Sequence, residues 1–380
     1  MYNRFMNKKN VDVLVIGSGP AGLLTSILAQ EERKVTLIEK PAKEFKLAKR
    51  ILVSGNGRAN FFNQDLLDGR IKPEYLPFIM DESHIYAKDF LSYLEQEGFS
   101  YVKDEKLFYP YFRRSECLHS FLMEKCKKVD ILQAKAVEVY PERNEILVLE
   151  EENKVIYHYQ DLVLAIGGRS FDRNDYDYRL LDSLKVRYLP YQSMLCPVRT
   201  TEKIPAYLNK NRLKGLLSVY SGERKIYEEE GEILFKEDGL SGIAVFNSTV
   251  SILNELRKNK NATIRFELDY TSLEGFKKNT SLSCYPSFLL KYLKEKKIKP
   301  ATPLEFHFKE MYSFKESQAS YGGILLDEVD MKTLSLIKYP HIYTLGEMLN
   351  VNLICGGYNM GISFIQGYRV GKHLGESYGI

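Results

Sequence analysis

The first forty residues alternate between apolar runs and a glycine-rich turn. Residues 11–16 are short, β-branched and almost wholly apolar, which is typical of a strand buried on both faces. Residues 23–30 then place apolar side chains at helical spacing, and residues 34–38 form a second apolar run. The pattern predicts a strand, a helix and a second strand, the unit from which parallel sheets are built.

The turn between the first strand and the helix has the spacing Gly-x-Gly-x-x-Gly. Gly17 permits a tight turn, Gly19 lets the backbone approach a pyrophosphate, and Gly22 lets the helix pack closely on the strand. The phosphates would face the free N–H groups of the helix. After the second strand, Glu39 stands where an acid accepts hydrogen bonds from an adenosine ribose. The predicted dinucleotide-binding residues are Gly17, Gly19, Pro20, Ala21, Gly22, Glu39 and Lys40.

Later segments favour FAD over NAD. Residues 161–168 form an apolar strand that runs into a glycine pair, and residues 340–347 form a strand that delivers an acid, followed by a glycine-opened helix. A helix N-terminus stabilises the negative charge of a reduced flavin, and a nicotinamide needs no such feature. In folds similar to glutathione reductase the acid contacts the ribityl chain, and a strand such as 134–140 bonds adenine. The further predicted FAD-binding residues are Val137, Ala165, Gly167, Gly168, Gly346, Glu347, Gly357, Tyr358 and Asn359.

The middle of the chain has a different pattern of apolar and polar positions. Between residues 190 and 320 the apolar positions first alternate in short runs and then take helical spacing. We therefore expect an α/β fold with a Rossmann-like FAD-binding domain of the glutathione-reductase type, formed by 1–189 and 321–380. A substrate domain over 190–320 would interrupt it, β-rich over 190–246 and helical over 247–320. No second Gly-x-Gly-x-x-Gly occurs, so a reductant would visit the flavin without a Rossmann domain of its own.

Length and charge agree with a folded protein of about two domains. The chain has 380 residues, of which 44% are hydrophobic and 27% charged, enough for a sizeable core. A net charge of +4 gives little reason to expect a nucleic-acid or membrane partner, so a small-molecule substrate is expected. The lysine-rich run 291–299 is interpreted as the solvated face of an amphipathic helix. Oligomeric state stays open.

The cysteines and histidines indicate the cellular compartment and whether a metal site is expected. Five widely spaced cysteines without a CxxC pair fit reduced thiols in the cytoplasm. Apolar stretches stay short of a membrane span, and the polar start lacks the apolar core of a signal peptide. Six scattered histidines without metal-ligand spacing predict no metal site. A cytoplasmic, metal-free enzyme is the resulting expectation.

Three segments together resemble a known family, the aminoacetone oxidase-like or HI0933-like flavoproteins, which include relatives of a proposed bile-acid reductase. The segments are residues 49–63, with Ser-Gly-Asn-Gly-Arg-Ala-Asn at their centre, residues 231–242, and residues 322–329 taken with Gly346-Glu347 and Gly356 to Asn359. They cover nearly the whole chain. Four positions depart from the family pattern: Ala59 replaces a Cys, Phe62 and Lys236 each a Thr, and Ile243 a Pro. The missing Cys argues against a thiol relay at the flavin.

The first of these segments makes physical sense as a flavin cradle. Gly55 and Gly57 permit a close backbone approach to a flat ring, and cationic side chains can offset pyrophosphate charge. Asn60 and Asn63 can bond flavin edges or, as the alternative, hold the backbone of their own loop. The residues predicted to bind FAD here are Lys49, Arg50, Ser54, Gly55, Asn56, Gly57, Arg58 and Asn60.

The resemblance implies an FAD-dependent oxidoreductase that moves a hydride between a small organic substrate and flavin N5. Two reactions stay open: oxidation of an amine with O2, as by aminoacetone oxidase, or reduction of a conjugated double bond with NAD(P)H as a transient electron donor. The alternative is a flavoprotein with structural FAD that acts as an RNA-associated or regulatory module. The sequence does not identify a catalytic residue.

Overall fold

The computed structural model describes residues 7–42, 46–70, 83–170, 178–277 and 279–376. The chain divides into two compact units, one of Met1–Gly168, Asp175–Tyr191 and Gly322–Ile380, the other of Arg169–Asn174 and Gln192–Tyr321. Two of the boundaries between them fall within strands, β10 (Tyr188–Met194) and β17 (Ala319–Ile324), which form a two-stranded sheet. The two units are described one after the other below.

The first unit contains a parallel sheet with Rossmann-type strand order. Five strands lie in the order β6-β2-β1-β9-β20, and each neighbouring pair is parallel. In chain order these are strands 3-2-1-4-5, so the direction of winding reverses between β1 and β9. Ligands of such sheets bind beyond the carboxyl ends of the strands at that reversal. The bounds are β1 (Asn7–Ile16), β2 (Val35–Glu39), β6 (Asp130–Gln133), β9 (Asn153–Leu164) and β20 (Tyr339–Thr344).

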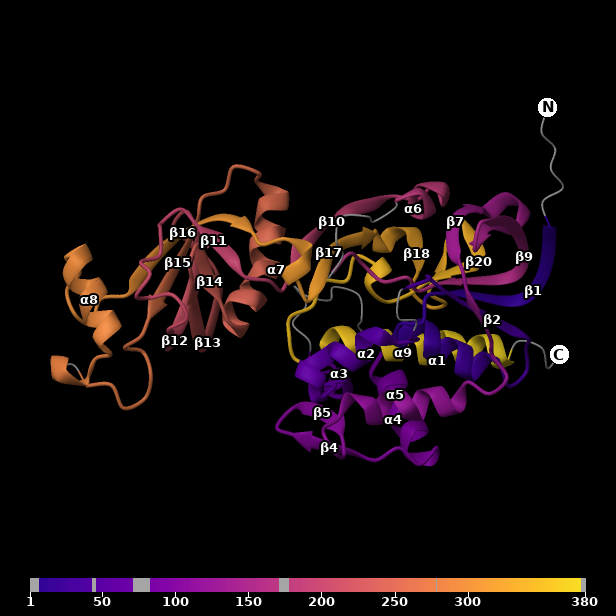
Figure 1. The fold of residues 1–380 in the computed structure, drawn as a ribbon, viewed down its shortest axis with the longest axis horizontal. Helices are drawn as coiled ribbons and strands as arrows, with labels where there is room; N and C mark the ends of the chain where they lie inside the picture. The colour runs from indigo at the N-terminus through magenta and orange to yellow at the C-terminus, as the bar shows by residue number, and fades with distance from the viewer. Residues whose placement is uncertain (1–6, 43–45, 71–82, 171–177, 278, 377–380) are drawn as a thin grey trace. The chain divides into compact units, whose positions relative to one another are not determined.

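Smaller elements complete this unit (Figure 1). An antiparallel meander, β7 (Lys135–Tyr140) and β8 (Glu145–Glu150), extends from β9, and β18 (Val329–Asp330) and β19 (Ser335–Leu336) extend from β20. A separate three-stranded sheet has the order β3-β5-β4. The remaining bounds are β3 (Phe62–Asn63), β4 (Tyr101–Asp104), β5 (Leu107–Pro110), α1 (Pro20–Ala29), α2 (Lys49–Val53), α3 (Gln64–Asp68), α4 (Ser83–Gln96), α5 (Ser115–Lys125), α6 (Arg179–Ser183) and α9 (Tyr358–Glu376).

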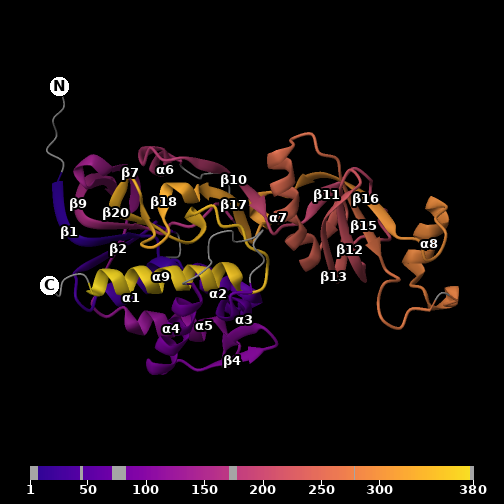
Figure 2. The same ribbon diagram turned by 180° about the vertical axis from the view of Figure 1, so that it is seen from behind.

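Helices α1 and α9 lie side by side along one face of the parallel sheet (Figures 1 and 2). Their close approach depends on glycines of α9, because a Cβ at Gly367 would lie 2.4 Å from the backbone oxygen of Ala21. The Thr25 hydroxyl also donates to the Gly367 carbonyl at 3.2 Å. The first and last elements of the chain are thus packed into one layer.

A buried ion pair fixes the loop that leads into β2. Arg33 donates to the Asp161 carboxylate of β9 at 2.6 Å and to the Gln160 side chain at 2.9 Å. The Arg33 side chain is only 3% exposed. Because removing one partner leaves a buried charge uncompensated, such pairs are costly to break.

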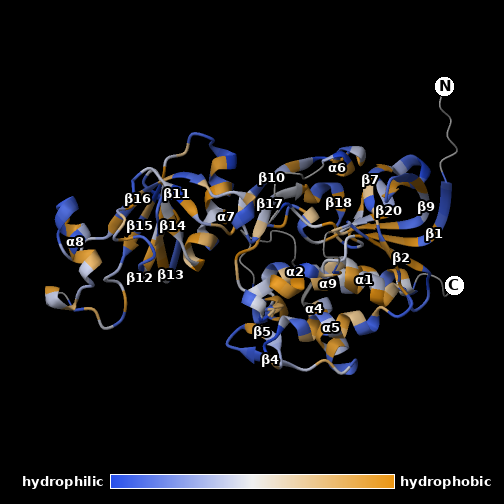
Figure 3. Ribbon diagram, in the orientation of Figure 1, coloured by the Kyte–Doolittle hydropathy of each residue, from blue (hydrophilic) through white to orange (hydrophobic). Residues whose placement is uncertain are grey.

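The second unit is built on a closed six-stranded barrel. The strands run β11-β14-β13-β12-β15-β16 around it, and Leu217, Ile233, Phe235, Phe266 and Phe306 are among the side chains of its core. Figure 3 shows hydrophobic residues on the barrel strands and on helix α1 of the first unit. The bounds are β11 (Val198–Thr200), β12 (Arg212–Ser221), β13 (Arg224–Lys236), β14 (Gly239–Ser241), β15 (Ile264–Asp269), β16 (Leu304–Met311), α7 (Ile243–Lys258) and α8 (Ser287–Lys296).

The expectation of a separate helical part over 247–320 is wrong. Helices α7 and α8 do lie there, but β15 and β16 lie between and after them and close the barrel. Both strands alternate apolar and polar side chains, as at Ile264, Phe266 and Leu268, and the apolar set is buried in the barrel core. This period of two is the signal of a strand with one buried face, and the sequence interpretation overlooked it.

Candidate functional site

The glycine turn joins β1 to α1 at the strand reversal. Gly17 has a φ of +100°, and a Cβ there would lie 2.5 Å from the Ala165 carbonyl oxygen. A Cβ at Gly22 would lie 2.0 Å from the Gly17 oxygen, whereas at Gly19 the nearest atom is the Ala165 oxygen at 3.9 Å. Gly17 and Gly22 are therefore required by internal packing. Gly19 instead presents bare backbone to open space, where a pyrophosphate fits.

The start of α1 is suited to an anion. Pro20 occupies the first turn, Gly19 is the N-cap without a side-chain bond, and the first turn holds no acidic residue. The first backbone N–H groups of a helix have no partner within it, and they carry the positive end of the helix dipole. The backbone at Ala21 and Gly22 can therefore donate to phosphate oxygens.

Glu39 is fixed beside this turn. Its Oε2 accepts from both the backbone N–H and the hydroxyl of Ser18, each at 2.6 Å, and its Oε1 accepts from the Lys40 N–H at 3.1 Å. The Ser18 hydroxyl in turn accepts from the Ala48 N–H at 2.9 Å. The carboxylate is thus oriented at the carboxyl end of β2, and it retains lone pairs for a ribose hydroxyl. The Lys40 side chain is exposed.

Val137 lies at a bulge in β7. The register with β8 runs from Ala136–Val148 to Glu138–Leu147 and skips Val137. A bulged residue is left out of the ladder. The Val137 backbone is therefore not committed to β8, which suits the predicted contact with an adenine edge.

The ends of β9 and β20 meet through a carboxylate. Glu347 Oε2 accepts from the Gly168 N–H at 3.2 Å, and the Gly346 N–H donates to the Gln366 side chain of α9 at 2.7 Å. Gly167 has a φ of +75°, and a Cβ there would meet nothing within 4 Å. These residues and Ala165 therefore border the same strand reversal as the glycine turn.

The loop after α2 is left-handed over three successive residues. Gly55, Asn56 and Gly57 have φ values of +54°, +54° and +80°, and a Cβ at Gly57 would meet nothing within 4 Å. The Ser54 hydroxyl donates to the Ile51 carbonyl at 2.7 Å. The side chains of Lys49, Arg50 and Arg58 are exposed, so these cations surround the loop without being buried in it.

Two asparagines tie this loop to the entry of α9. With the Asn60 amide assigned the orientation in which both of its polar atoms find partners, it donates to the Phe62 carbonyl at 3.1 Å and accepts from the Gly357 N–H at 3.2 Å. Asn63 donates to the Gly356 carbonyl at 2.7 Å and accepts from the Asp65 N–H at 2.9 Å. Both side chains therefore bond protein backbone, each with one bond inside its own segment and one to the residues just before α9. Their effect is to hold the loop against the start of the last helix.

Tyr358 and Asn359 also bond within the protein. The Tyr358 hydroxyl donates to Asp65 at 2.7 Å, and the Asn359 amide donates to the Leu353 carbonyl at 3.2 Å and to the Ile354 carbonyl at 3.3 Å. Their side chains fix the first turn of α9. What they can offer a cofactor is the backbone of that turn.

The structure thus brings most predicted residues to one edge of the sheet. The groups that would hold an FAD are bare backbone at Gly19 for a phosphate, an oriented carboxylate at Glu39 for a ribose, and a glycine loop with the start of α9 for the ring system. Sequence reasoning missed three polar side chains that fix these groups, Ser18, Gln366 and Asp65. Ser18 lies inside the glycine motif, whereas nothing in the sequence distinguished the other two.

Comparison with known proteins agrees with this geometry. A family model for the HI0933-like protein Rossmann domain matches residues 11–373. The chain belongs to this family. Its members are FAD-dependent oxidoreductases, so the chain is an FAD-dependent enzyme of the HI0933-like family.

Two curated relatives match nearly end to end. Ribosomal RNA dihydrouridine synthase of Escherichia coli is 24% identical, over 92% of this chain and 94% of that protein. The 3-dehydro-bile acid delta(4,6)-reductase of Clostridium scindens is 23% identical, over 95% and 98%. Among solved structures, 3-ketosteroid delta1-dehydrogenase from Sterolibacterium denitrificans has a TM-score of 0.53 at 11% identity, over 97% of this chain and 100% of that chain. That likeness shows the fold, an FAD-binding α/β domain with an inserted domain.

The second family segment, residues 231–242, lies in the barrel of the second unit. A Cβ at Gly239 would lie 1.9 Å from the Val198 oxygen, and a Cβ at Gly242 would lie 2.2 Å from the Glu232 oxygen. Beside them, burial raises the pKa of Asp238, but hydrogen bonds from Tyr312 and Arg199 outweigh this and lower it. Gly239 and Gly242 of this segment are thus explained by close backbone packing in the barrel.

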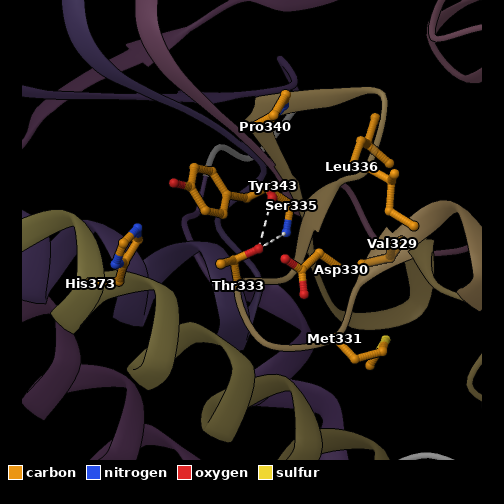
Figure 4. Close-up of a pocket in the computed structure, with 10 residues that line it drawn as sticks. Val329, Asp330, Met331, Thr333, Ser335, Leu336, Pro340, Tyr343 and His373 are labelled. Carbon is orange, nitrogen blue, oxygen red and sulfur yellow. Dashed lines mark hydrogen bonds between the residues drawn. The ribbon is translucent and has the colours of Figure 1, made fainter.

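A pocket of about 610 Å³ lies elsewhere in the first unit (Figure 4). Tyr343 of β20 and His373 of α9 border it, together with Asp330, Thr333 and Ser335. None of the residues predicted to hold FAD lines this pocket.

Among the described helices of the chain, none has the length and apolar character needed to cross a membrane.

Proposed function

We propose that this enzyme reduces a carbon–carbon double bond conjugated to a carbonyl group, with NADH or NADPH as the electron donor. The observation that supports it most is the kind of reaction that the names of the two curated relatives describe. One makes a dihydrouridine and the other is a delta(4,6)-reductase of a 3-dehydro bile acid. Each name describes the addition of hydrogen to a double bond in a carbonyl compound, and each protein matches more than nine-tenths of this chain.

The overall reaction balances without a further reactant. One NAD(P)H and one proton are consumed, NAD(P)+ is released, and the two carbons of the double bond gain two hydrogens. The carbon distant from the carbonyl takes the hydride, because the carbonyl oxygen can then carry the developing negative charge, and the nearer carbon takes the proton. When bound, FAD supplies a centre that can accept a hydride from one partner and give it to the other.

Different residues of the first unit would bind different parts of the FAD. The backbone at Gly19, Ala21 and Gly22 would hold the pyrophosphate, and Glu39 would orient a ribose. The start of α9, fixed by Tyr358 and its bond to Asp65, would place helix N–H groups at the ring edge. A helix N-terminus there would stabilise negative charge on the ring edge.

The sequence supports transient binding of NAD(P)H. The glycine motif at residues 17–22 is the one dinucleotide motif of the chain, and FAD would occupy it. The donor would therefore bind without a dinucleotide motif of its own. Amine oxidation with O2 remains the second reaction that the family resemblance implies, and the same experiment distinguishes it.

The test is anaerobic reduction followed by reoxidation. The purified protein should carry FAD, and NADH or NADPH should bleach the flavin absorbance. Adding uridine-containing RNA or a steroid dienone should restore it, and mass spectrometry should find a product heavier by two hydrogens. If these acceptors leave the flavin reduced while aminoacetone and O2 yield peroxide with the oxidised enzyme, the proposal is wrong and the oxidase reaction replaces it.

A further inference from the structure

Gln366 lies in the middle of α9 and is almost fully buried. The residue is 6% exposed, and its Oε1 accepts from the Gly346 N–H at 2.7 Å. Because a backbone N–H can only donate, this bond fixes the orientation of the amide and leaves the two N–H groups of Nε2 to find acceptors. Among the described residues, none accepts from Nε2. A buried donor without an acceptor costs free energy, so this amide needs an acceptor that the described chain does not supply.

A second buried glutamine of the same unit has both ends of its amide bonded. Gln30, directly after α1, is also 6% exposed. Its Nε2 donates to the Ile27 carbonyl at 2.9 Å and to the Lys125 carbonyl at 2.6 Å, and its Oε1 accepts from the Lys128 N–H at 2.9 Å. The fold therefore satisfies every group of the Gln30 amide, whereas it uses only the acceptor end of Gln366.

The Gln366 amide lies beside the first turn of α1. Gly346, which donates to it, is a neighbour of Ala21, since a Cβ at Gly346 would lie 3.9 Å from the Ala21 Cβ. Gly367, the next residue of α9, also packs on Ala21, with its Cβ position 2.4 Å from the Ala21 oxygen. Both neighbours of Gln366 thus contact a residue whose backbone can donate to phosphate oxygens.

The surroundings of this amide favour an anionic acceptor. The first turn of α1 contains no acidic residue, and its N-cap Gly19 has no side-chain bond. Nε2 of Gln366 is not fully enclosed by protein atoms, so it borders space that a ligand can enter. Phosphate oxygens are the acceptors expected at such a helix start, and a hydrogen bond to a charged oxygen is stronger than one between neutral groups.

We propose that Gln366 is an FAD-binding residue whose Nε2 donates to a pyrophosphate oxygen, while its Oε1 holds Gly346 at the end of β20. One amide then connects the last helix, the end of the strand and the cofactor. The inference rests on the binding of FAD and not on the reaction proposed above, so each can fail without the other.

The experiment measures the dissociation constant of FAD by calorimetric titration of the FAD-stripped full-length protein. We expect Gln366→Met, which has a similar volume and no donor, to weaken binding roughly tenfold, because a hydrogen bond to a charged group is lost. Gln366→Glu keeps an acceptor for the Gly346 N–H but places a carboxylate against the phosphates. At pH 8, well above the ordinary pKa of a glutamate, it should weaken binding more, by about a hundredfold.

Gln30→Met is the matched control. It removes a glutamine of equal burial whose amide bonds only protein backbone. It should therefore lower the urea midpoint of the FAD-free protein and leave the affinity for FAD unchanged. If Gln30→Met weakens FAD binding as much as Gln366→Met, the loss of affinity follows from general destabilisation and the proposal fails.

The two Gln366 variants together identify the acceptor. Normal FAD affinity of both variants overturns the proposal, since the cofactor then takes no bond from this amide. If Gln366→Met weakens binding and Gln366→Glu does not, the partner is a hydroxyl group that can donate to a carboxylate, and the pyrophosphate assignment is overturned. Weaker binding by both, with the larger loss in Gln366→Glu, supports the proposal whichever substrate the enzyme reduces or oxidises.

Discussion

At the scale of single residues, the three glycines of the nucleotide motif have different roles. Gly17 and Gly22 are required by contacts inside the fold, since added Cβ atoms would lie 2.5 Å and 2.0 Å from backbone oxygens. Gly19 has extended backbone angles and open space around it. One motif therefore combines two glycines that internal packing requires with one that packing does not require, and we assign that one to the cofactor.

We predict that Gly19→Val loses bound FAD while the protein stays folded. The valine side chain would occupy the space that the pyrophosphate needs, and its backbone angles allow a branched residue. FAD per chain after gel filtration should fall at least about tenfold, the equivalent of about 1.4 kcal/mol. Thermal unfolding of the FAD-free protein should be unchanged.

The matched change at Gly22 should behave differently. Gly22→Val forces a side chain against the Gly17 carbonyl, so the FAD-free protein itself should unfold at lower temperature. Equal stability of the two FAD-free variants would contradict the division of roles, and so would normal FAD content in Gly19→Val.

At the scale of elements, the first and last helices depend on each other. Helix α9 packs against α1 through glycines, and its starting turn is held to the loop after α2 by Asn60 and Asn63. The sequence showed these two asparagines as candidates for cofactor contact or for loop bonds. Their partners at Gly356 and Gly357 lie some 300 positions later, so the loop-to-helix contact could be known only from the fold.

We predict that Gly367→Ala destabilises the whole first unit. Its Cβ would lie 2.4 Å from the Ala21 oxygen, so α1 and α9 must separate, and overpacking of this kind costs about 1–3 kcal/mol. Urea unfolding should show a lower midpoint. Lys372→Ala on the exposed face of α9 is the control, and its midpoint should match that of the unchanged protein. A Gly367→Ala midpoint equal to that of the control would refute the packing argument.

At the scale of the whole molecule, the chain is two units with separate cores. The barrel closes with β15 and β16, and its buried side chains form a cluster of their own. The Rossmann sheet is assembled from both ends of the chain, because β1 pairs with β9 and β9 pairs with β20. A long insertion between β9 and β20 is tolerated because loop-closure entropy grows slowly with length.

We predict that the fragment 192–321 folds by itself. It carries the complete barrel, so circular dichroism should show strands and urea should unfold it in one cooperative transition. Phe266→Ala should unfold the fragment, because a large side chain deleted from a core costs about 3–5 kcal/mol. A fragment without cooperative unfolding would show that the barrel depends on the first unit.

The sequence by itself determined the cofactor half of this protein. A strand, a glycine turn, a helix and an acid are contiguous, and local spacing carries their meaning, so the fold class and FAD followed from residues 11–39 and their later counterparts. The barrel strands β15 and β16 were overlooked although their alternation was present, because the helices α7 and α8, which precede them in turn, dominated the pattern.

Only the tertiary structure showed which side chains of the candidate site bond to the protein itself. Ser18, Gln366 and Asp65 fix Glu39, Gly346 and Tyr358 through bonds that join distant segments. Likewise, exposure alone distinguishes Tyr111 and Phe112 from the many buried rings of this chain. Spacing along a chain reports on neighbours in sequence, whereas burial and hydrogen bonding depend on which segments the fold brings together.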